Sequence, residues 1–187
     1  MMNRDRHRLL DAYLVAAART GDGRAFEALV RRWQGRLSAH AWRLLGNHDQ
    51  ARDAVQEAWT EIARRLGRLQ DEHAFPAWAF RIVSRRCARL VRSNQHTRAI
   101  GDAVAAAPSA SAPEESFGGR EIDRLRAAIR HLPPEQRAAI ALFYFEDLSV
   151  AEVAVALDTP AGTIKTRLMH ARRKLRAELE GNIPCET

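Results

Sequence analysis

Apolar residues recur at three- and four-residue spacing along most of this 187-residue chain, which is the repeat of an α-helix rather than of a strand. Glycine, proline and β-branched residues are sparse, whereas alanine, arginine and leucine dominate, a mixture that favours helices over sheets. Apolar residues make up 46% of the chain, which is enough to form packed cores. The sequence therefore predicts an all-α fold.

One segment interrupts the helical pattern. Residues 103–119 read AVAAAPSASAPEESFGG, a run of small residues with proline and serine and few large apolar side chains. Such a segment cannot bury enough surface to offset the entropy lost on ordering. We therefore expect two small helical domains, at residues 9–95 and 121–180, joined by a flexible linker at residues 96–120.

The first domain is predicted to contain four helices. The first helix carries an apolar stripe that should face the core, formed by Leu9, Ala12, Tyr13 and Ala16. Gly46 should end the second helix, because glycine adopts the left-handed conformation readily, and Asp49 should cap the third. The second to fourth helices are expected at residues 25–45, 49–66 and 77–92, with a loop at residues 67–75.

The charge of the chain suits a polyanionic partner. Thirty Lys and Arg stand against 23 Asp and Glu, which gives a net charge of +7 and a pI near 10.5. The alternative is an arginine-rich composition that spreads cations over every surface, and it gains support because only two of the cations are lysine. Total charge alone leaves both interpretations open.

Several classes of site and location find no support in the sequence. Cys87 and Cys185 form no CxxC motif, and the seven histidines are dispersed, so we expect no disulfide framework, metal site or cofactor. Cys87 is expected to be a buried apolar thiol. Residues 1–10 lack an apolar signal region, and no stretch reaches the ~18–20 apolar residues of a membrane span. A cytoplasmic protein without membrane insertion is therefore expected.

The second domain ends in a pattern typical of a helix-turn-helix. Ser149 and Glu152 have the spacing of a capping box, which predicts the start of a short helix. The run Asp158-Thr159-Pro160 then breaks the chain, and a second helix follows. The stripe of this second helix that should face inward consists of Ile164, Leu168, Ala171 and Leu175.

The opposite face of this second helix is basic. Residues 163–176 hold six cations and no anion. A helix with such a face can lie in the major groove, with its first residues at base edges and its later cations on phosphates. The alternative is a solvated basic face on an ordinary helical hairpin. The candidate DNA-binding residues are Thr163, Lys165, Thr166, Arg167, His170, Arg172, Arg173 and Lys174.

These motifs resemble those of a known family. Residues 148–168, LSVAEVAVALDTPAGTIKTRL, closely resemble region 4 of sigma-70 family factors. Two domains with a linker and no intervening region are similar to the small extracytoplasmic-function (ECF) group, and the resemblance covers about residues 10–180. The other matching segments are LPPEQR at 132–137 in region 4, ARDAVQE at 51–57 in the region 2 helix, and FPAW at 75–78 with Arg81-Ile82 after it.

The resemblance implies contacts with RNA polymerase. In sigma factors the region 2 helix docks on the coiled coil of the β′ subunit, and region 4 touches the flap of the β subunit. Asp53, Glu57 and Glu61 recur every four residues and form an acidic stripe that a basic coiled coil would complement. The alternative is pairing with arginines three or four residues away in the same helix. The residues implied to bind core polymerase are Asp53, Gln56, Glu57 and Glu61.

Residues 67–92 match the part that the family uses at the minus-ten element, where the duplex opens and an unstacked base is held. Unstacking a base costs about a few kcal/mol, which aromatic stacking and arginine–phosphate contacts can offset. Phe75, Trp78 and Phe80 are candidate stacking rings, whereas core packing is the alternative for Phe75 and the preferred interpretation for Trp78 and Ile82. The arginines implied to contact minus-ten DNA are Arg81, Arg85, Arg86 and Arg89.

Some positions depart from the family pattern. The acidic residue common at the start of the region 2 motif is Gln50 here, with Asp49 one place earlier. Arg85 and Arg89 stand where asparagine and aspartate are frequent, which adds positive charge near the melted strand. Asp158 stands where a turn glycine is usual, and aspartate tolerates the left-handed conformation better than most residues.

We therefore expect an ECF-type sigma factor, not an enzyme, that binds core RNA polymerase and promoter DNA, with region 4 at the minus-thirty-five element. Many factors of this group are held inactive by an anti-sigma factor, so the resemblance admits that partner as well. The main alternative is a stand-alone helix-turn-helix regulator that binds a duplex operator. A sigma-like adaptor without promoter selectivity is another. A helical enzyme would need a phosphate loop, metal-ligand spacing or a nucleophile–base motif, and the sequence contains none.

Overall fold

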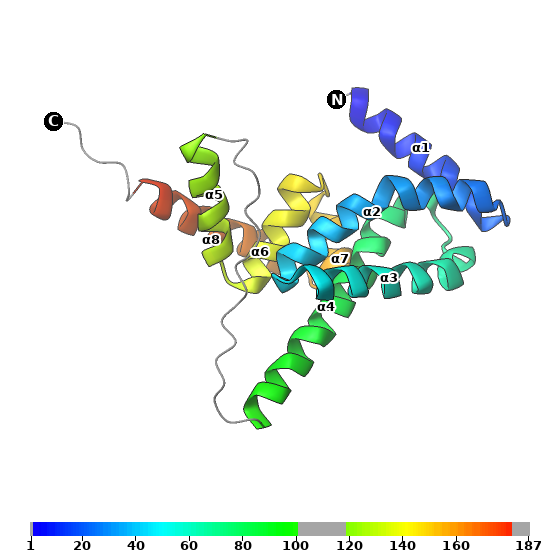
Figure 1. The fold of residues 1–187 in the computed structure, drawn as a ribbon. Coiled ribbons are helices and arrows are strands. Elements are labelled where there is room, and N and C mark those ends of the chain that lie inside the picture. Colours follow the sequence, from blue (N-terminus) through cyan, green and yellow to red (C-terminus); the bar gives the residue numbers. More distant parts are fainter. Residues whose placement is uncertain (1, 101–118, 181–187) are drawn as a thin grey trace.

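The computed structural model describes residues 2–100 and 119–180, with only the backbone described at residues 2–6, 94–100, 120 and 121. This described part contains helices and no strand, which confirms the all-α expectation (Figure 1). Its α-helices are α1 (Met2–Arg19), α2 (Gly23–Leu45), α3 (His48–Arg65), α4 (Phe75–Ile100), α5 (Arg120–His131), α6 (Pro134–Ile140), α7 (Val150–Leu157) and α8 (Ala161–Glu180).

Two residues between α2 and α3 set the corner of the first unit, α1–α4. Gly46 ends α2 in the left-handed conformation, with φ of 67°, and its N–H donates to the Trp42 carbonyl at 2.8 Å, as expected for this glycine. The cap of α3 is Asn47 and not Asp49, because the Asn47 side chain accepts from the Gln50 N–H at 2.9 Å. Asp49 lies in the first turn instead, where a carboxylate favours the helix dipole.

The prediction of which face of α1 lies inward is wrong. Leu9 and Tyr13 are 64% and 67% exposed, whereas Asp11 and Leu14 are buried. The apolar residues of α1 fit more than one helical stripe, and periodicity alone does not choose between them. Asp11 is able to lie inward because Arg32 donates to its carboxylate at 2.6 Å, which compensates the buried charge.

α4 is longer than the sequence pattern indicates. It spans Phe75–Ile100, whereas the apolar pattern predicts residues 77–92. The predicted loop before α4 contains two short 3₁₀ turns, Leu66–Arg68 and Glu72–Ala74. Since α4 continues past residue 95, the proposed division of the chain into domains and linker stays a prediction. Most of the predicted linker lies outside the described residues.

In the second unit, α5–α8, helices α5 and α8 lie at the end of the molecule away from α1, whereas α7 packs against α4 (Figure 1). Pro134 is the first residue of α6, where its missing N–H leaves no helical bond unmade. A π-helical turn, Ala141–Phe145, follows α6 and leaves Tyr144 and Phe145 half exposed, at 51% each. Glu146 directly follows this turn, and its N–H donates to the Ala141 carbonyl at 3.2 Å.

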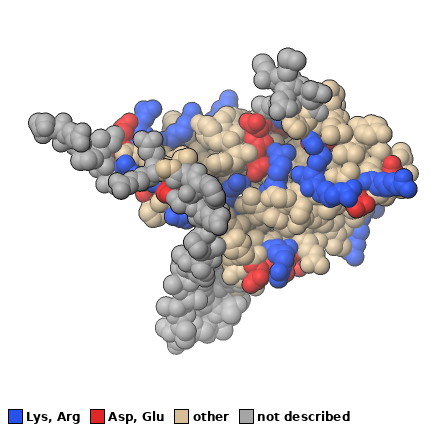
Figure 2. Space-filling model, turned by 45° about the horizontal axis from the view of Figure 1, so that its top comes forward, with Lys and Arg blue, Asp and Glu red and all other residues tan. Residues whose placement is uncertain are grey.

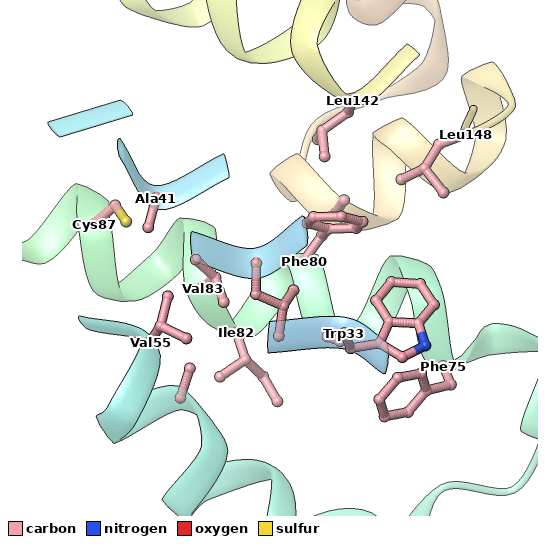
Figure 3. Packing of buried hydrophobic residues seen from close by; sticks show 14 of the residues in the cluster. Trp33, Ala41, Val55, Phe75, Phe80, Ile82, Val83, Cys87, Leu142 and Leu148 are labelled. Carbon is pink, nitrogen blue, oxygen red and sulfur yellow. The ribbon is translucent and has the colours of Figure 1, made fainter. Parts of the chain in front are cut away.

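One hydrophobic core joins the two units. Phe80 on α4 is fully buried and belongs to the same cluster as Leu142 and Leu148 of the second unit. Figure 3 shows the Phe80 ring between Trp33 and the segment that carries Leu142 and Leu148. The Trp33 and Phe80 rings meet edge to face, with centroids 5.9 Å apart. The two units therefore pack as one body, a contact that helical periodicity does not predict.

Charged side chains are interspersed on the face that Figure 2 shows, with acidic side chains directly beside basic ones. This mixing supports, for that face, the interpretation in which cations are spread over the surface. Among the helices of residues 2–100 and 119–180, none has both the length and the apolar character needed to cross a membrane.

Candidate nucleic-acid and protein interfaces

α7 and α8 form the predicted helix-turn-helix. The Ser149 hydroxyl accepts from the Glu152 N–H at 3.2 Å, and the Glu152 carboxylate accepts from the Ser149 N–H at 2.7 Å, so the capping box is confirmed. Asp158 ends α7 in the left-handed conformation, with φ of 53°, and its N–H donates to the Ala154 and Val155 carbonyls. The turn therefore forms with aspartate in the place of the usual glycine.

α8 presents its basic face to solvent. Ile164, Leu168 and Ala171 are buried and Leu175 is half-buried, which confirms the inward stripe. Arg167 and His170 are half-buried, and the other predicted DNA-binding residues of this helix are exposed: Thr163, Lys165, Thr166, Arg172, Arg173 and Lys174. In the part of the chain that the structure describes, the cations of this set form no ion pair with a carboxylate.

The acidic stripe lies on the surface of α3. Asp53, Gln56 and Glu57 are exposed, and Glu61 is half-buried. Arg65 pairs with Glu61 at 2.7 Å, one turn along the same helix, which is the intrahelical pairing considered as the alternative. Asp53 and Gln56 at the start of the stripe are therefore exposed, whereas the charge of Glu61 at its end is partly neutralised by Arg65.

Arg86 connects α4 to this stripe. Its Nη2 donates to Glu61 Oε2 at 2.7 Å, and its Nη1 donates to Glu57. The hydrogen bond from Arg86 lowers the pKa of Glu61, and the same bond raises the pKa of Arg86. The Arg86 side chain is 23% exposed and bridges two helices, which sets it apart from the other arginines predicted to contact minus-ten DNA.

The rings considered for base stacking lie mostly in the core. Phe75 and Phe80 are fully buried, with the Phe75 ring 5.3 Å from that of Trp33, so neither is open to a base in this structure. Ile82 is 6% exposed, which confirms core packing for that residue. Trp78 is half-buried and packs against the same core.

The remaining candidate arginines of α4 lie along its solvent side. Arg89 is exposed. Arg81 Nη2 donates to Asp158 Oδ1 at 2.6 Å, and Arg85 Nη2 donates to Asp158 Oδ2 at 2.8 Å. The hydrogen bond from Arg85, together with the charges of both arginines, lowers the pKa of Asp158. Two of the arginines predicted to bind DNA are therefore joined to the turn between α7 and α8.

A buried carboxylate that the sequence analysis missed also joins the units. Glu146 is 5% exposed and accepts from Arg36 Nε at 2.9 Å and from Arg43 Nη1 at 3.1 Å. The Arg36 guanidinium also lies over the Trp33 ring, 4.2 Å from its centroid. Arg36 and Arg43 stand two turns apart on one face of α2, and this spacing is the only sign of the cluster in the sequence.

His40 and Cys87 are titratable side chains that lie inside the first unit. His40 is fully buried and hydrogen-bonded through Nε2 to Ser84 Oγ at 3.0 Å, and burial lowers its pKa to about 3, so it is neutral near pH 7. Cys87 is 1% exposed, and burial raises the pKa of its thiol to about 12. The expectation of a buried apolar thiol at Cys87 is confirmed.

Two packed helical units, the second carrying a helix-turn-helix with an exposed basic helix, define a class of DNA-binding transcription protein. Residues 29–97 match the family model described as Sigma-70 region 2, and residues 122–175 match that described as Sigma-70, region 4.

Relatives and solved structures agree with these matches. The ECF RNA polymerase sigma factor SigM of Mycobacterium tuberculosis (strain H37Rv) is 33% identical over 172 residues, covering 91% of this chain and 85% of the relative. The RNA polymerase sigma-H factor of Pseudomonas aeruginosa is 28% identical over 181 residues, covering 91% and 94%. The structure of sigma factor RpoE in complex with the anti-sigma factor NepR from Bartonella quintana matches this chain with a TM-score of 0.74 at 24% identity. The match covers 84% of this chain and 98% of that chain, and it shows that the two share the fold.

The chain belongs to the sigma-70 family, as a member of the ECF group of RNA polymerase sigma factors. This assignment confirms the resemblance and favours a sigma factor over a stand-alone helix-turn-helix regulator.

Proposed function

We propose that this ECF sigma factor directs promoter-specific transcription initiation through three surfaces, one for core RNA polymerase and two for DNA. It acts by binding rather than by catalysis, in the cytoplasm where polymerase transcribes. The observation that carries the proposal is the separation of charge between α3, whose exposed stripe begins with acidic side chains, and α8, whose exposed face is basic.

The α3 surface binds the polymerase. Asp53, Gln56 and Glu57 are exposed side by side on consecutive turns, and the packed face of α3 is formed by apolar residues instead. Carboxylates on such an open face complement the basic coiled coil expected in the β′ subunit. Glu61 belongs to the same stripe, but its charge is shared with Arg65 and Arg86, so we expect it to contribute less than Asp53.

The α8 surface binds the minus-thirty-five element. Its basic face is solvent-exposed, and Lys165 and Thr166 stand in the first turns, where a recognition helix contacts base edges. Arg172, Arg173 and Lys174 follow and suit phosphate contacts, which position the helix without reading sequence. DNA affinity should therefore fall steeply as salt rises.

The α4 surface binds the minus-ten element. Arg81, Arg85 and Arg89 occur at every fourth residue and follow one side of the helix, a spacing suited to the phosphates of a melted strand. Because Phe75 and Phe80 are buried, the contribution of α4 rests on these cations more than on stacking rings.

An anti-sigma factor is proposed as a further partner. The Bartonella quintana structure of the same fold is a complex of a sigma factor with an anti-sigma factor. A protein that covers α3 or separates the two units would withhold this chain from polymerase.

Run-off transcription with purified core polymerase tests the division of labour. Asp53→Arg should abolish co-purification with core polymerase and transcription, because it places a cation against a basic partner. Lys165→Ala with Arg167→Ala should keep polymerase binding and lose promoter use. Arg31→Ala is the matched control, since Arg31 is an exposed cation on α2 that pairs with Glu27.

The outcomes separate this proposal from its rival. If both test variants transcribe as the Arg31→Ala control does, the assigned surfaces are wrong. A stand-alone regulator would bind promoter duplex tightly without polymerase, so strong gel retardation by the isolated chain, with no effect of core enzyme, would favour that alternative.

A further inference from the structure

The turn of the helix-turn-helix rests on the helix that is proposed to hold the minus-ten strand. Asp158 places one carboxylate oxygen on Arg81 at 2.6 Å and the other on Arg85 at 2.8 Å. The main-chain N–H of Asp158, and not its carboxylate, caps α7. The carboxylate therefore serves the contact between the units and is not needed for the turn itself.

The same charge pattern recurs at two other places in the contact between the units. Three carboxylates that the second unit contributes there are paired with arginine side chains of the first unit. Arg8 donates to both oxygens of Glu152, at 2.9 and 3.1 Å. These pairs join Glu146 to Arg36 and Arg43, Glu152 to Arg8, and Asp158 to Arg81 and Arg85. The first unit thus offers arginines and the second unit offers carboxylates.

An apolar layer underlies these ion pairs. Val153 and Ala156 on the inner side of α7 are 0% and 1% exposed, as is Phe80 at 0% on α4. Removing these side chains from water provides a driving force for docking that salt does not screen, whereas the half-exposed ion pairs at Asp158 are screened. The contact therefore has a stable apolar centre, and at its edge the ion pairs of Asp158 can be replaced by other charged groups.

We infer that this docked arrangement is a resting form in which Asp158 occupies Arg81 and Arg85 in the place of DNA phosphates. The inference rests on the proposed function, which assigns these two arginines to the minus-ten strand. An arginine that donates to the Asp158 carboxylate cannot give the same N–H groups to a phosphate, so single-stranded DNA must displace Asp158 to bind. The basic face of α8 is exposed in this docked arrangement, so the contact with Asp158 keeps DNA from α4 and not from α8.

Binding of a short fluorescent single-stranded DNA to the full chain tests the inference by anisotropy. Asp158→Asn removes the charge and keeps a residue that tolerates the left-handed conformation, so the turn is preserved. It should tighten binding by about 2- to 10-fold, the range that two exposed ion pairs contribute to an equilibrium. Asp49→Asn is the matched control, because it removes an exposed carboxylate paired with Arg52 and should change affinity by less than about twofold.

A double-mutant cycle distinguishes occupation of Arg81 and Arg85 by Asp158 from simple repulsion between the Asp158 charge and DNA. In a chain that carries Arg81→Ala and Arg85→Ala, the Asp158→Asn change should give no gain in affinity, because the arginines it releases are absent. A gain of the same size in that background, or no gain in the native background, would overturn the inference.

X-ray scattering gives a readout that does not depend on DNA or polymerase. Combining Asp158→Asn with Glu146→Gln should increase the radius of gyration of the full chain, since the units then separate more often, and an unchanged radius would overturn the resting form. Failure of the native chain in run-off transcription, with these responses intact, would remove the proposed function and leave the docked form standing.

Discussion

The ion pairs of Glu146 offer the sharpest test of how the two units hold together. Its side chain is 4% exposed and receives hydrogen bonds from Arg36 and Arg43, and Arg36 also donates to its main-chain carbonyl at 3.0 Å. Glu146→Gln keeps the size of the side chain and one acceptor oxygen but removes the charge. The change therefore leaves two arginines facing a neutral group across the contact.

The magnitude follows from the burial of the three side chains. A shielded hydrogen bond to a charged group contributes about 1.5–3 kcal/mol. Arg36 and Arg43 are 39% and 24% exposed, so water replaces part of what they lose, and the bond to the main-chain carbonyl remains. We expect Glu146→Gln to lower the free energy of unfolding by about 1–3 kcal/mol, less than the loss of a fully buried pair.

Urea unfolding followed by tryptophan fluorescence measures this change, because Trp33 lies 1% exposed beneath the Arg36 guanidinium. Glu27→Gln is the matched control, since Glu27 is 65% exposed and pairs with Arg31 on one helix, and it should shift stability by less than about 0.5 kcal/mol. Equal stabilities of the two variants would refute the conclusion that Glu146 holds the units together.

Two further predictions concern buried titratable groups. Burial lowers the pKa of His40 from 6.5 to about 3, so between these pH values this side chain takes up a proton only in the unfolded chain. The contribution of His40 to stability is complete above pH 6.5 and falls as the pH drops below it, by up to about 1.4 kcal/mol per pH unit. His40→Gln should therefore reduce the slope of stability against pH in urea titrations at successive pH values. Because burial raises the pKa of Cys87 to about 12, the thiol should resist iodoacetamide in a folded Cys185→Ser chain and react in urea. Mass spectrometry counts the added group, and rapid alkylation without urea would contradict the assigned burial.

Local signals in the sequence were sufficient for the elements that carry their own chemistry. The capping box at Ser149, the glycine stop at Gly46 and the inward stripe of α8 depend on residues within one or two turns, and all three are present in the structure. The exposed face of α8 follows from the same stripe, so most of the residues of this helix predicted to contact DNA are exposed, whereas Arg167 and His170 are half-buried.

Periodicity was a weaker guide where two faces of a helix were both apolar. Leu9 and Tyr13 of α1 lie outward, and the face that lies inward carries Leu14, Val15 and the Asp11 carboxylate paired with Arg32. The end of α4 was also underestimated, since no proline or glycine follows residue 92 within that helix to stop it.

The sequence by itself determined that this chain is helical, that it carries a basic helix-turn-helix, and that it resembles sigma factors, because those properties lie in neighbouring residues and in short motifs. Only the tertiary structure decided which carboxylates the arginines of the first unit pair with. Arg81, Arg85 and Arg86 look alike in the sequence, yet two of them reach Asp158 and the third reaches Glu57 and Glu61. The partner of a charge depends on which distant helix packs beside it, and residues separated by some 70 positions along the chain come within hydrogen-bond distance only when the core between the units closes.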